Sequence, residues 1–528
     1  MDDKTNIKKG KNTLNSVIIV LILTVATKLL GFVREALIGS NFGTGVEADA
    51  YQMAQRITIT IFMAIGAAIT VSVVPIITKY YTKGENEKAN KFINKVITFF
   101  LMLSAGITIL VLFFAKEYTS IIAGGFTGER LALTIDFVKI LFPSCMVIFA
   151  AYVIRAVLQS RESFIGYSIM SVPFNLFLIL YLMFWVGDYG IYGLVVSTLI
   201  AWAFQLIIQI PFTAKDKMKY ALDFKIAKDK DINKFFILFM PILFSTLIYS
   251  VSTIIDSRFA SSLPEGRVSA LNYGYGIYAA IAQTLIYSIS AVLFPKLVDN
   301  FNVKEFTEFK VDVKNIINNI FYIMIPAQFG LIVLSRPFVE MVFMRGKFDI
   351  NSANLTQSAF IFFSVGLVGF ALQEIISKTY FSVNDTKIPT ITAILSVILN
   401  IVLNIILIGT LGMKGLALAT SISITFNAIV MYIVFQIKYG KWDNIEVIWN
   451  GTRVLAASLI MYFSVNYLLI NLNKVIAISN NFVYNLVSLV VASLFGIVVY
   501  GLATYILKVK QTEELVEKIA GMIKRRKT

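Results

Sequence analysis

Residues 171–198 read SVPFNLFLILYLMFWVGDYGIYGLVVST, two apolar runs separated by a short turn that contains glycine and aspartate. The runs belong to longer apolar segments, residues 164–186 and 191–212. Each segment is long enough, as a helix, to cross a hydrocarbon core of roughly 30 Å. The stretch therefore predicts a pair of membrane-spanning helices.

A second stretch, residues 396–421, repeats this pattern as SVILNIVLNIILIGTLGMKGLALATS. Both stretches place an asparagine early in the first helix, at Asn175 and Asn400. Both then continue with the pattern G-x-x-G-L, which begins at Gly190 and Gly412. Six predicted spans separate the copies, so they share one orientation and indicate a parallel internal repeat. Chance similarity between two apolar stretches is the alternative.

The composition extends the membrane prediction to the whole chain. Of 528 residues, 57% are hydrophobic and 15% are charged, and the mean hydropathy is +0.77, a balance far from that of a soluble domain. The apolar runs predict about 14 spans: residues 14–38, 51–80, 92–115, 132–158, 164–186, 191–212, 234–256, 271–297, 312–334, 353–381, 388–409, 413–437, 450–471 and 482–507. The fold class is therefore an all-α polytopic membrane protein.

Lysine-rich connections alternate with connections that carry few lysines. The rich set includes the N-terminus, residues 1–13, the loop at 214–233 and the tail at 509–528. By the positive-inside rule these segments face the cytoplasm, together with both termini, which requires an even number of spans. Membrane topology thus accounts for the net charge of +16, and we expect no nucleic-acid partner.

The repeat predicts two six-helix lobes around a central cavity, an N-lobe at residues 14–213 and a C-lobe at 234–438. Two further helices occupy residues 449–508. The tail at 509–528 has apolar residues at helical spacing and a basic end. We expect it to lie on the inner leaflet, held partly by anionic lipid; a frayed, solvated tail is the alternative.

The lack of histidine, the single cysteine and the lack of a P-loop exclude most kinds of catalysis. The chain has no histidine and one cysteine, Cys145, which excludes Ser-His and Cys-His catalysis, ordinary zinc sites and a disulfide framework. The sequence GGFTGERLALT, residues 124–134, lacks the lysine and serine with which a P-loop grips phosphate. We expect no enzyme activity, catalytic residue, cofactor or metal. If the chain is a transporter, it has no ATPase of its own and would use an ion gradient, the membrane potential or the gradient of its substrate.

The candidate site comes from charges in the stretch TKLLGFVREALIGSNFGTGVEADAY, residues 27–51. Lys28 and Glu35 lie seven positions apart on one helix face, and Arg34 is close to that face. A charge in the middle of a spanning helix costs roughly 2.5–3.5 kcal/mol, so these side chains are expected to face a polar cavity, together with Arg56 from the second span. An excess of cations there predicts an anionic substrate, because guanidinium groups bind diphosphate oxygens in pairs.

Other charges are weaker candidates. Asp256 and Arg258 end the span that opens the second half, while Glu374 and Lys378 lie in a later span. The alternative for all these charges is that they pair with one another or reach the membrane interface. It applies most directly to Arg258 and to Asp49, which lie near the ends of spans.

Residues 28–51 resemble the first helix and loop of the MurJ (MviN) family of lipid II flippases, in a superfamily with polysaccharide-unit flippases and MATE exporters. Residues 343–421 resemble its second half, from the R-G-x-F-D turn through D-T-K-x-P to G-L-A-L-A-T. The likeness covers roughly residues 14–510. It implies 14 helices in two lobes around a V-shaped, cation-lined cavity in the bacterial cytoplasmic membrane.

The resemblance also implies the function. Alternating access would carry lipid II, or another polyprenyl-diphosphate-linked saccharide, from the inner to the outer leaflet for cell-wall biosynthesis. A groove beside the last two helices would hold the prenyl tail. Membrane lipids and cell-wall synthesis proteins are the other implied partners.

The family's motifs imply the site residues. The pattern G-F-x-R-[DE] places its arginine on Arg34 and its acidic residue on Glu35, and the basic position before L-G-F falls on Lys28. The acidic residue of the T-D-A-[FY] turn falls on Asp49. The implied roles are diphosphate binding by Arg34, helped by Lys28 and Arg56, and pairing or gating by Glu35 and Asp49.

Two departures from the family pattern concern the substrate. The second-span pattern R-R-x-F-x-E-G aligns with ITIFMAIG, residues 59–66, which has no arginine. The pattern Y-A-D-R-L reads YGYGI, with Gly276 at the arginine position. Asp256, Glu374 and Lys378 are candidates to complete the site. The alternatives are a flippase for a capsule, teichoic or exopolysaccharide unit, an ion-coupled exporter of amphiphiles, or a non-transporting scaffold for cell-wall enzymes.

Overall fold

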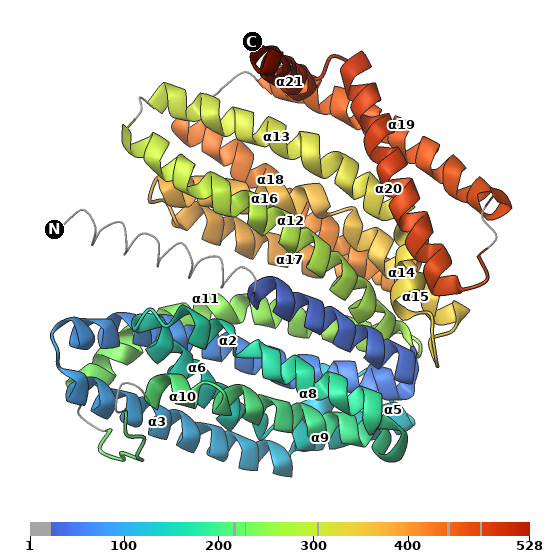
Figure 1. The fold of residues 1–528 in the computed structure, drawn as a ribbon. Helices are drawn as coiled ribbons and strands as arrows, with labels where there is room; N and C mark the ends of the chain where they lie inside the picture. Colours follow the sequence, from blue (N-terminus) through green and yellow to red (C-terminus); the bar gives the residue numbers. More distant parts are fainter. Residues whose placement is uncertain are drawn as a thin grey trace. The chain divides into compact units, whose positions relative to one another are not determined.

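The computed structural model describes residues 23–214, 218–226, 229–303, 306–440, 444–475 and 478–527. Within these residues every regular element is a helix, as the ribbon in Figure 1 shows. The predicted all-α class is therefore confirmed. Residues 1–13, and the beginning of the predicted span at 14–38, lie outside the described part.

The chain divides into two compact units, Met1–Ser269 and Ala270–Thr528. The first unit contains a helix over residues 23–42, followed by α2 (Val46–Thr82), α3 (Asn86–Phe113), α4 (Ala115–Ile122), α5 (Gly128–Leu141), α6 (Ser144–Ser160), α7 (Phe164–Ser168), α8 (Ser171–Phe184), α9 (Val186–Ile207), α10 (Ile210–Ala214) and α11 (Lys230–Ser261). In this unit α2 is central, because it packs against α5, α6 and α11.

The second unit contains most of α12 (Arg267–Val303), then α13 (Phe306–Val333), α14 (Ser335–Phe343), α15 (Ile350–Ser364), α16 (Leu367–Ser382), α17 (Lys387–Leu411), α18 (Met413–Tyr439), α19 (Asn444–Val475), α20 (Asn481–Ile506) and α21 (Lys510–Lys527). Here α18 packs on α16 and α17, while α19 lies between α13 and α20. The helix α11, expected to open the C-lobe, packs on α2 in the first unit. The lobe boundaries and the central cavity stay predictions.

The helices are long and apolar enough to account for most of the predicted spans. Among the described residues, 10 helices could cross a membrane, or up to 12 if two bent pairs each form one span. The bent pairs are α5 with α6, at 44°, and α15 with α16, at 41°. The remaining predicted spans fall on the helix over residues 23–42 and on α12. The exact number of 14 stays a prediction.

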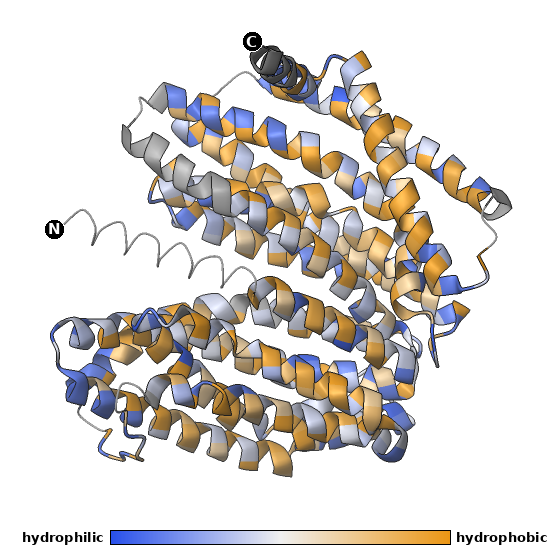
Figure 2. Cartoon of the chain, in the orientation of Figure 1, coloured by the Kyte–Doolittle hydropathy of each residue, from blue (hydrophilic) through white to orange (hydrophobic). Residues whose placement is uncertain are grey.

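Several helices bury their polar side and expose their apolar side. In α17 the buried side chains are Thr392, Ser396, Asn400 and Asn404, spaced by four residues along one face, whereas Ile405 is 60% exposed. Figure 2 shows apolar residues along much of α9 and α20. This pattern is the reverse of a soluble helix and is expected where lipid surrounds the protein and polar groups bond between helices.

In both units the predicted repeat contains a glycine with the same unusual backbone conformation. Gly190, at a kink near the start of α9, has φ 53° and ψ −145°, and Gly412, between α17 and α18, has φ 56° and ψ −130°. Only glycine adopts such angles readily. Three residues later a Cβ on Gly193 would lie 2.2 Å from the Tyr181 hydroxyl, and one on Gly415 would lie 2.4 Å from the Leu407 carbonyl. The G-x-x-G pattern thus encodes one tight turn, used twice.

We expect Gly190→Ala and Gly412→Ala each to destabilise the protein by about 1–3 kcal/mol, the cost of forcing a Cβ into this backbone region. Gly187→Ala is the matched control, because a Cβ there meets nothing within 4 Å. Thermal unfolding of the full chain in detergent measures the difference. Equal melting temperatures for Gly187→Ala and Gly190→Ala would contradict this account of the repeat.

Two of the sequence motifs in the second unit are structural. Asp385, from D-T-K-x-P, accepts hydrogen bonds from Lys438 Nζ at 2.6 Å and from the Tyr439 hydroxyl at 3.0 Å. The Lys438 contact holds the pKa of the Asp385 carboxyl below its usual value. Asp349, from R-G-x-F-D, caps α15 by accepting from Ser352 N at 2.8 Å. Both aspartates therefore fix turns at helix ends.

Candidate functional site

The structure places Arg34 in a polar cluster of the first unit. Arg34 lies on the helix over residues 23–42, and its Nη1 donates to Asn175 Oδ1, on α8, at 3.0 Å. Its Nη2 donates to Glu35 Oε1 at 2.6 Å. The Phe174 ring lies beside the guanidinium, 5.5 Å from its carbon to the ring centroid. Two helices thus determine where this cation points.

Asn175 is the residue that fixes the Arg34 side chain. Only 5% of Asn175 is exposed, and its Nδ2 donates to the Ser171 carbonyl at 2.9 Å. That bond leaves Oδ1 as the atom that faces Arg34. Its counterpart in the repeat, Asn400, instead accepts from Asn404 Nδ2 at 3.1 Å. The same position therefore holds a cation in the first unit and another amide in the second.

Glu35 neutralises Arg34 only in part. Its second oxygen is 3.5 Å from Gln52 Nε2, on α2, and the side chains of Arg34 and Glu35 are 20% and 29% exposed. A guanidinium has five N–H groups, and the contacts to Asn175 and Glu35 use one from each of two nitrogens. The remaining donors of a half-buried, pre-oriented guanidinium are suited to the oxygens of a phosphate.

Lys28 and Arg56 lie in the same unit as Arg34. Lys28 is on the helix that carries Arg34, and Arg56 is on α2, the helix that carries Gln52. Both side chains are half-buried and take part in contacts of their own. Their membership in one anion site with Arg34 stays a prediction.

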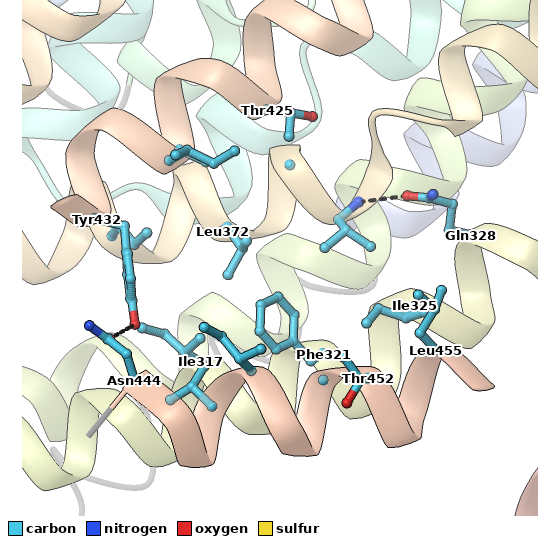
Figure 3. A pocket seen from close by; sticks show the side chains of 18 of the residues that line it. Ile317, Phe321, Ile325, Gln328, Leu372, Thr425, Tyr432, Asn444, Thr452 and Leu455 are labelled. Carbon is cyan, nitrogen blue, oxygen red and sulfur yellow. Dashed lines mark hydrogen bonds between the residues drawn. The ribbon is translucent and has the colours of Figure 1, made fainter. Parts of the chain in front are cut away.

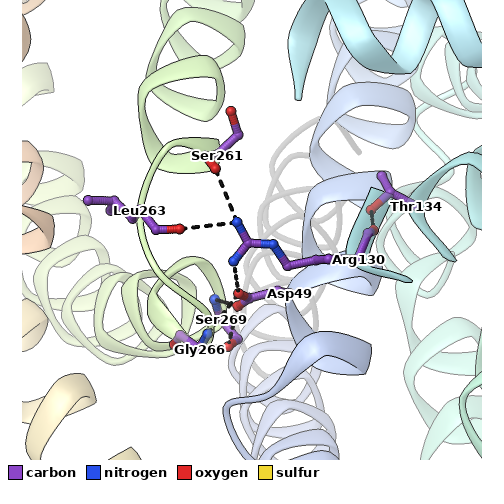
Figure 4. A network of polar contacts seen from close by, with 7 residues as sticks. All are labelled: Asp49, Arg130, Thr134, Ser261, Leu263, Gly266 and Ser269. Carbon is purple, nitrogen blue, oxygen red and sulfur yellow. Dashed lines mark hydrogen bonds and ion pairs between the residues drawn. The ribbon is translucent and has the colours of Figure 1, made fainter. Parts of the chain in front are cut away.

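Asp49 lies in a separate, completely buried network at the start of α2 (Figure 4). Its carboxylate accepts from the backbone N–H of Gly266 at 2.8 Å and of Ser269 at 2.7 Å, and from the Ser269 hydroxyl at 2.7 Å. These donors belong to the first turn of α12 and the residue before it, where a carboxylate satisfies free N–H groups and complements the helix dipole. Arg130 completes the set with Nη1 at 3.1 Å from Asp49 Oδ2.

Arg130 binds the end of α11 while it pairs with Asp49. Its Nη2 donates to the carbonyls of Ser261 and Leu263, both at 3.1 Å, and its guanidinium stacks 3.9 Å from the Phe126 ring. The cation thus meets the negative end of α11 and the anion meets the positive end of α12. Asp49 therefore matches the structural alternative raised by its sequence position, and a gating role stays a prediction.

The stretch GGFTGER, residues 124–130, also belongs to this network, although the sequence analysis only excluded it as a P-loop. Gly125 N donates to the Ser261 hydroxyl at 3.0 Å, and a Cβ on Gly125 would lie 2.5 Å from the Ser261 backbone. The paired glycines were the available signal, because glycine permits close backbone approach. Arg130 was missed because its partners lie more than eighty residues away in either direction.

The secondary candidates fall in different units. Lys378 and Glu374 pair along α16 in the second unit, with 3.2 Å between Nζ and Oε1 and about a quarter of each side chain exposed. Asp256, on α11, is half-buried in the first unit and has contacts of its own. Their contribution to one substrate site stays a prediction.

The second unit contains a pocket of about 810 Å³, here called the α16 pocket, between α13, α16, α18 and α19 (Figure 3). Apolar side chains such as Phe321, Leu372 and Leu455 form most of its wall. Polar groups are few and already bonded: Gln328 Oε1 accepts from Val368 N at 3.2 Å, and the Tyr432 hydroxyl donates to Asn444 Oδ1 at 2.8 Å. The pocket is thus suited to a hydrocarbon ligand.

Comparisons with known proteins agree with this arrangement. A family model described as lipid II flippase MurJ matches residues 38–510. A probable lipid II flippase MurJ of Buchnera aphidicola subsp. Schizaphis graminum is 28% identical over 471 residues, which cover 87% of this chain and 90% of that protein. A protein of the same description from Vibrio cholerae is 26% identical over 472 residues, 86% of this chain and 88% of its own.

Solved structures give the same result for the fold. A lipid II flippase MurJ in an inward closed conformation matches with a TM-score of 0.79 and 25% identity, over 94% of this chain and all of that one. An inward-facing MATE family multidrug transporter matches with a TM-score of 0.66 and 16% identity, over 80% of this chain and 98% of its own, and it supports the fold alone. Because the family model covers most of the sequence, this chain belongs to the lipid II flippase MurJ family.

Proposed function

We propose that this chain moves lipid II from the inner to the outer leaflet of the bacterial cytoplasmic membrane by alternating access. Arg34 is the observation that carries the proposal: a half-buried guanidinium, oriented by Asn175 and Phe174, with donors left for an anion. The family's description as lipid II flippase and the many apolar helices support the same function. Transport of a bound lipid needs no covalent chemistry, so the protein acts as a transporter and not as an enzyme.

Arg34 would bind the diphosphate of the substrate, with Lys28 and Arg56 adding positive charge. Glu35 pairs with Arg34 at 2.6 Å and reduces the cost of holding the cation in the membrane. An incoming diphosphate competes with Glu35 for the same guanidinium. Binding and release would therefore be an exchange between two anions, which keeps the cation paired throughout the cycle.

The α16 pocket would hold part of the polyprenyl chain. Its wall is apolar, its polar groups are already bonded, and its volume of about 810 Å³ suits a large hydrocarbon. Each buried methylene contributes about 0.8 kcal/mol, so even part of a long chain would add substantially to binding.

Filling the α16 pocket tests this role. We expect Gly451→Leu to reduce transport at low substrate concentration by roughly 15- to 50-fold, since its side chain displaces two or three methylene groups of the ligand. A Cβ on Gly451 meets Phe321 at 3.4 Å, an ordinary contact, so the protein should fold. Gly409→Leu is the control, because that exposed glycine of α17 lies outside the lining. Unchanged transport in Gly451→Leu would remove the pocket from the proposal.

A second candidate is a flippase for another undecaprenyl-linked glycan. The family's arginine positions carry no cation here: the second-span segment at residues 59–66 has no arginine, and Gly276, where a Cβ would meet nothing within 4 Å, stands at the other position. A smaller set of cations suits a lipid-linked glycan with fewer negative charges.

The deciding experiment uses cells depleted of their own lipid II flippase. Expression of this chain should restore the amount of lipid II that is accessible at the outer face of the membrane. Restoration supports lipid II as the substrate. Failure to restore it, with the protein present in the membrane at normal level, would reject lipid II and direct the same assay to capsule or teichoic precursors.

A further inference from the structure

The second unit has another cavity, on a different face of α13 from the α16 pocket. It has a volume of about 420 Å³ and is lined by α13, α19 and α20, and we call it the α20 groove. Its shape depends on Pro326, Gly330, Met461, Ala492 and Gly496. The two linings have no residue in common. The α20 groove is therefore a separate site, and the transport proposal does not use it.

The length of the α20 groove matches one leaflet of a bilayer. Along α13 the lining runs from Tyr322 to Val333, about eleven residues or roughly 16 Å at the rise of an α-helix. The hydrocarbon core of a membrane is roughly 30 Å thick, so the groove covers about half of it. A ligand that enters from one leaflet would fill it from end to end.

The α20 groove is open on the side of the membrane-spanning surface. Ile323 and Ile497, at its rim, are 44% and 67% exposed, and both belong to candidate membrane spans. Glycine makes the hollow: a Cβ on Gly330 would meet nothing within 4 Å, and one on Gly496 would meet Val465 at 3.2 Å. In a bilayer such an apolar opening faces acyl chains, because water finds no partner on its wall.

One end of the groove is polar. The Tyr500 hydroxyl donates to the Tyr322 carbonyl at 2.7 Å, and the Thr512 hydroxyl is 3.1 Å from the Tyr322 hydroxyl. Thr512 lies on the first turn of α21, two residues after Lys510, whose side chain is 52% exposed. The end of the groove therefore meets a cationic turn.

Charge at this turn favours an anion. Two cations share one carboxylate here: Lys314 pairs with Glu446, and Lys510 Nζ lies 3.2 Å from it. A third cation, Arg453, donates to the Lys508 carbonyl at 2.9 Å. Asp312 on α13 and Glu513 and Glu514 on α21 add negative charge nearby, and Lys310 and Lys508 add positive charge. Together with the residues named above, these segments carry five cations and four carboxylates. The local excess of positive charge is the arrangement that attracts anionic lipid headgroups.

We propose that the α20 groove binds one acyl chain of an anionic glycerophospholipid, of the phosphatidylglycerol class, with its phosphate at Lys510. The groove has about half the volume of the α16 pocket and the length of one leaflet, which suits an acyl chain better than a long polyprenyl chain. The bound lipid fills the space between α13, α19 and α20 and links the last two helices to the rest of their unit.

The test uses the purified full chain in vesicles that contain phosphatidylglycerol with a photoreactive group in its acyl chain. Light should label peptides from α13 and α20. Gly330→Leu fills the groove and should reduce this labelling by roughly 15- to 50-fold, the factor for two or three displaced methylene groups. The matched control, Gly106→Leu, places the same side chain at an exposed glycine of α3 where a Cβ meets nothing within 4 Å and should label as the wild type does. Equal labelling of Gly330→Leu and wild type would overturn the site.

A second arm tests the headgroup and the occupant. A zwitterionic phosphatidylcholine probe with the same acyl chain should label the groove less than phosphatidylglycerol does, and Lys510→Gln should reduce that preference. Equal labelling by the two headgroups would overturn the anionic assignment. Stronger labelling of the same peptides by a photoreactive polyprenyl diphosphate would assign the groove to the transported lipid instead. Neither readout depends on transport, so the proposal can fail while the flippase function stands.

Discussion

Arg34→Ala should abolish most transport while the protein remains folded and present at normal level. Arg34 would form a desolvated, hydrogen-bonded charge pair with the diphosphate of the substrate. Removing one partner from such a pair costs about 2–5 kcal/mol, which corresponds to a loss of affinity for the substrate of roughly thirtyfold to several thousandfold. Arg34→Lys should lie between alanine and the wild type, because lysine keeps the charge but lacks the planar fork that binds two oxygens at once. Lipid II accessibility at the outer face, normalised to protein in the membrane, measures the effect.

The control for Arg34 is an arginine that also stacks on an aromatic ring. Arg161 lies 3.7 Å from the Tyr81 ring, at the end of α6, away from the Arg34 cluster. Arg161→Ala removes the same charge and a similar stacking contact, and we expect it to transport lipid II. Full transport by Arg34→Ala, or an equal loss in the two variants, would show that Arg34 has no special role.

The sequence predicted the architecture well because lipid imposes a simple rule on every spanning segment. Backbone groups must bond within the segment, so length and hydropathy alone locate the helices, and each predicted span with described residues falls on a helix. The repeat was visible because Gly190 and Gly412 need backbone angles that other residues adopt only with strain. The short helices α4 and α14 were not predicted, because each begins where charged residues end an apolar run, Lys116 and Glu117 in α4 and Arg336 in α14, and each is too short to be a span of its own.

The candidate site was predictable only where it follows from one helix. The spacing of Lys28, Arg34 and Glu35 indicated a polar face from the sequence alone. The partners Asn175 and Gln52 come from other helices, and no local pattern links them to Arg34. Asn175 was noticed in the sequence because Asn400 occupies the same position in the repeat. Only the structure shows that Asn175 contacts a cation whereas Asn400 contacts another asparagine.

Asp49→Ala should destabilise the first unit by about 3–5 kcal/mol. The substitution leaves Arg130 buried without its carboxylate, and it also leaves the N–H groups of Gly266 and Ser269 without their acceptor. Arg130→Ala should cost less, because Asp49 keeps its three donors from Gly266 and Ser269. Denaturant unfolding of the full chain in detergent measures both values. The exposed pair of Lys88 and Glu85, 3.0 Å apart, is the control, and Glu85→Ala should change stability by less than about 1 kcal/mol.

The double variant Asp49→Ala with Arg130→Ala separates the interaction between these two residues from their contacts with other groups. If Asp49 and Arg130 act on each other, the combined loss should fall short of the sum of the single losses by roughly 1–3 kcal/mol, because the second substitution removes a charge that the first had already left unpaired. Additive losses would mean that each residue works only at its own helix end.

Transport measurements distinguish a structural role of the Asp49–Arg130 pair, here called the clamp, from a gating role. A variant as stable as the wild type that no longer transports would favour gating by Asp49. Loss of transport only in proportion to loss of folded protein favours the clamp, which is the outcome that four contacts on a fully buried carboxylate lead us to expect.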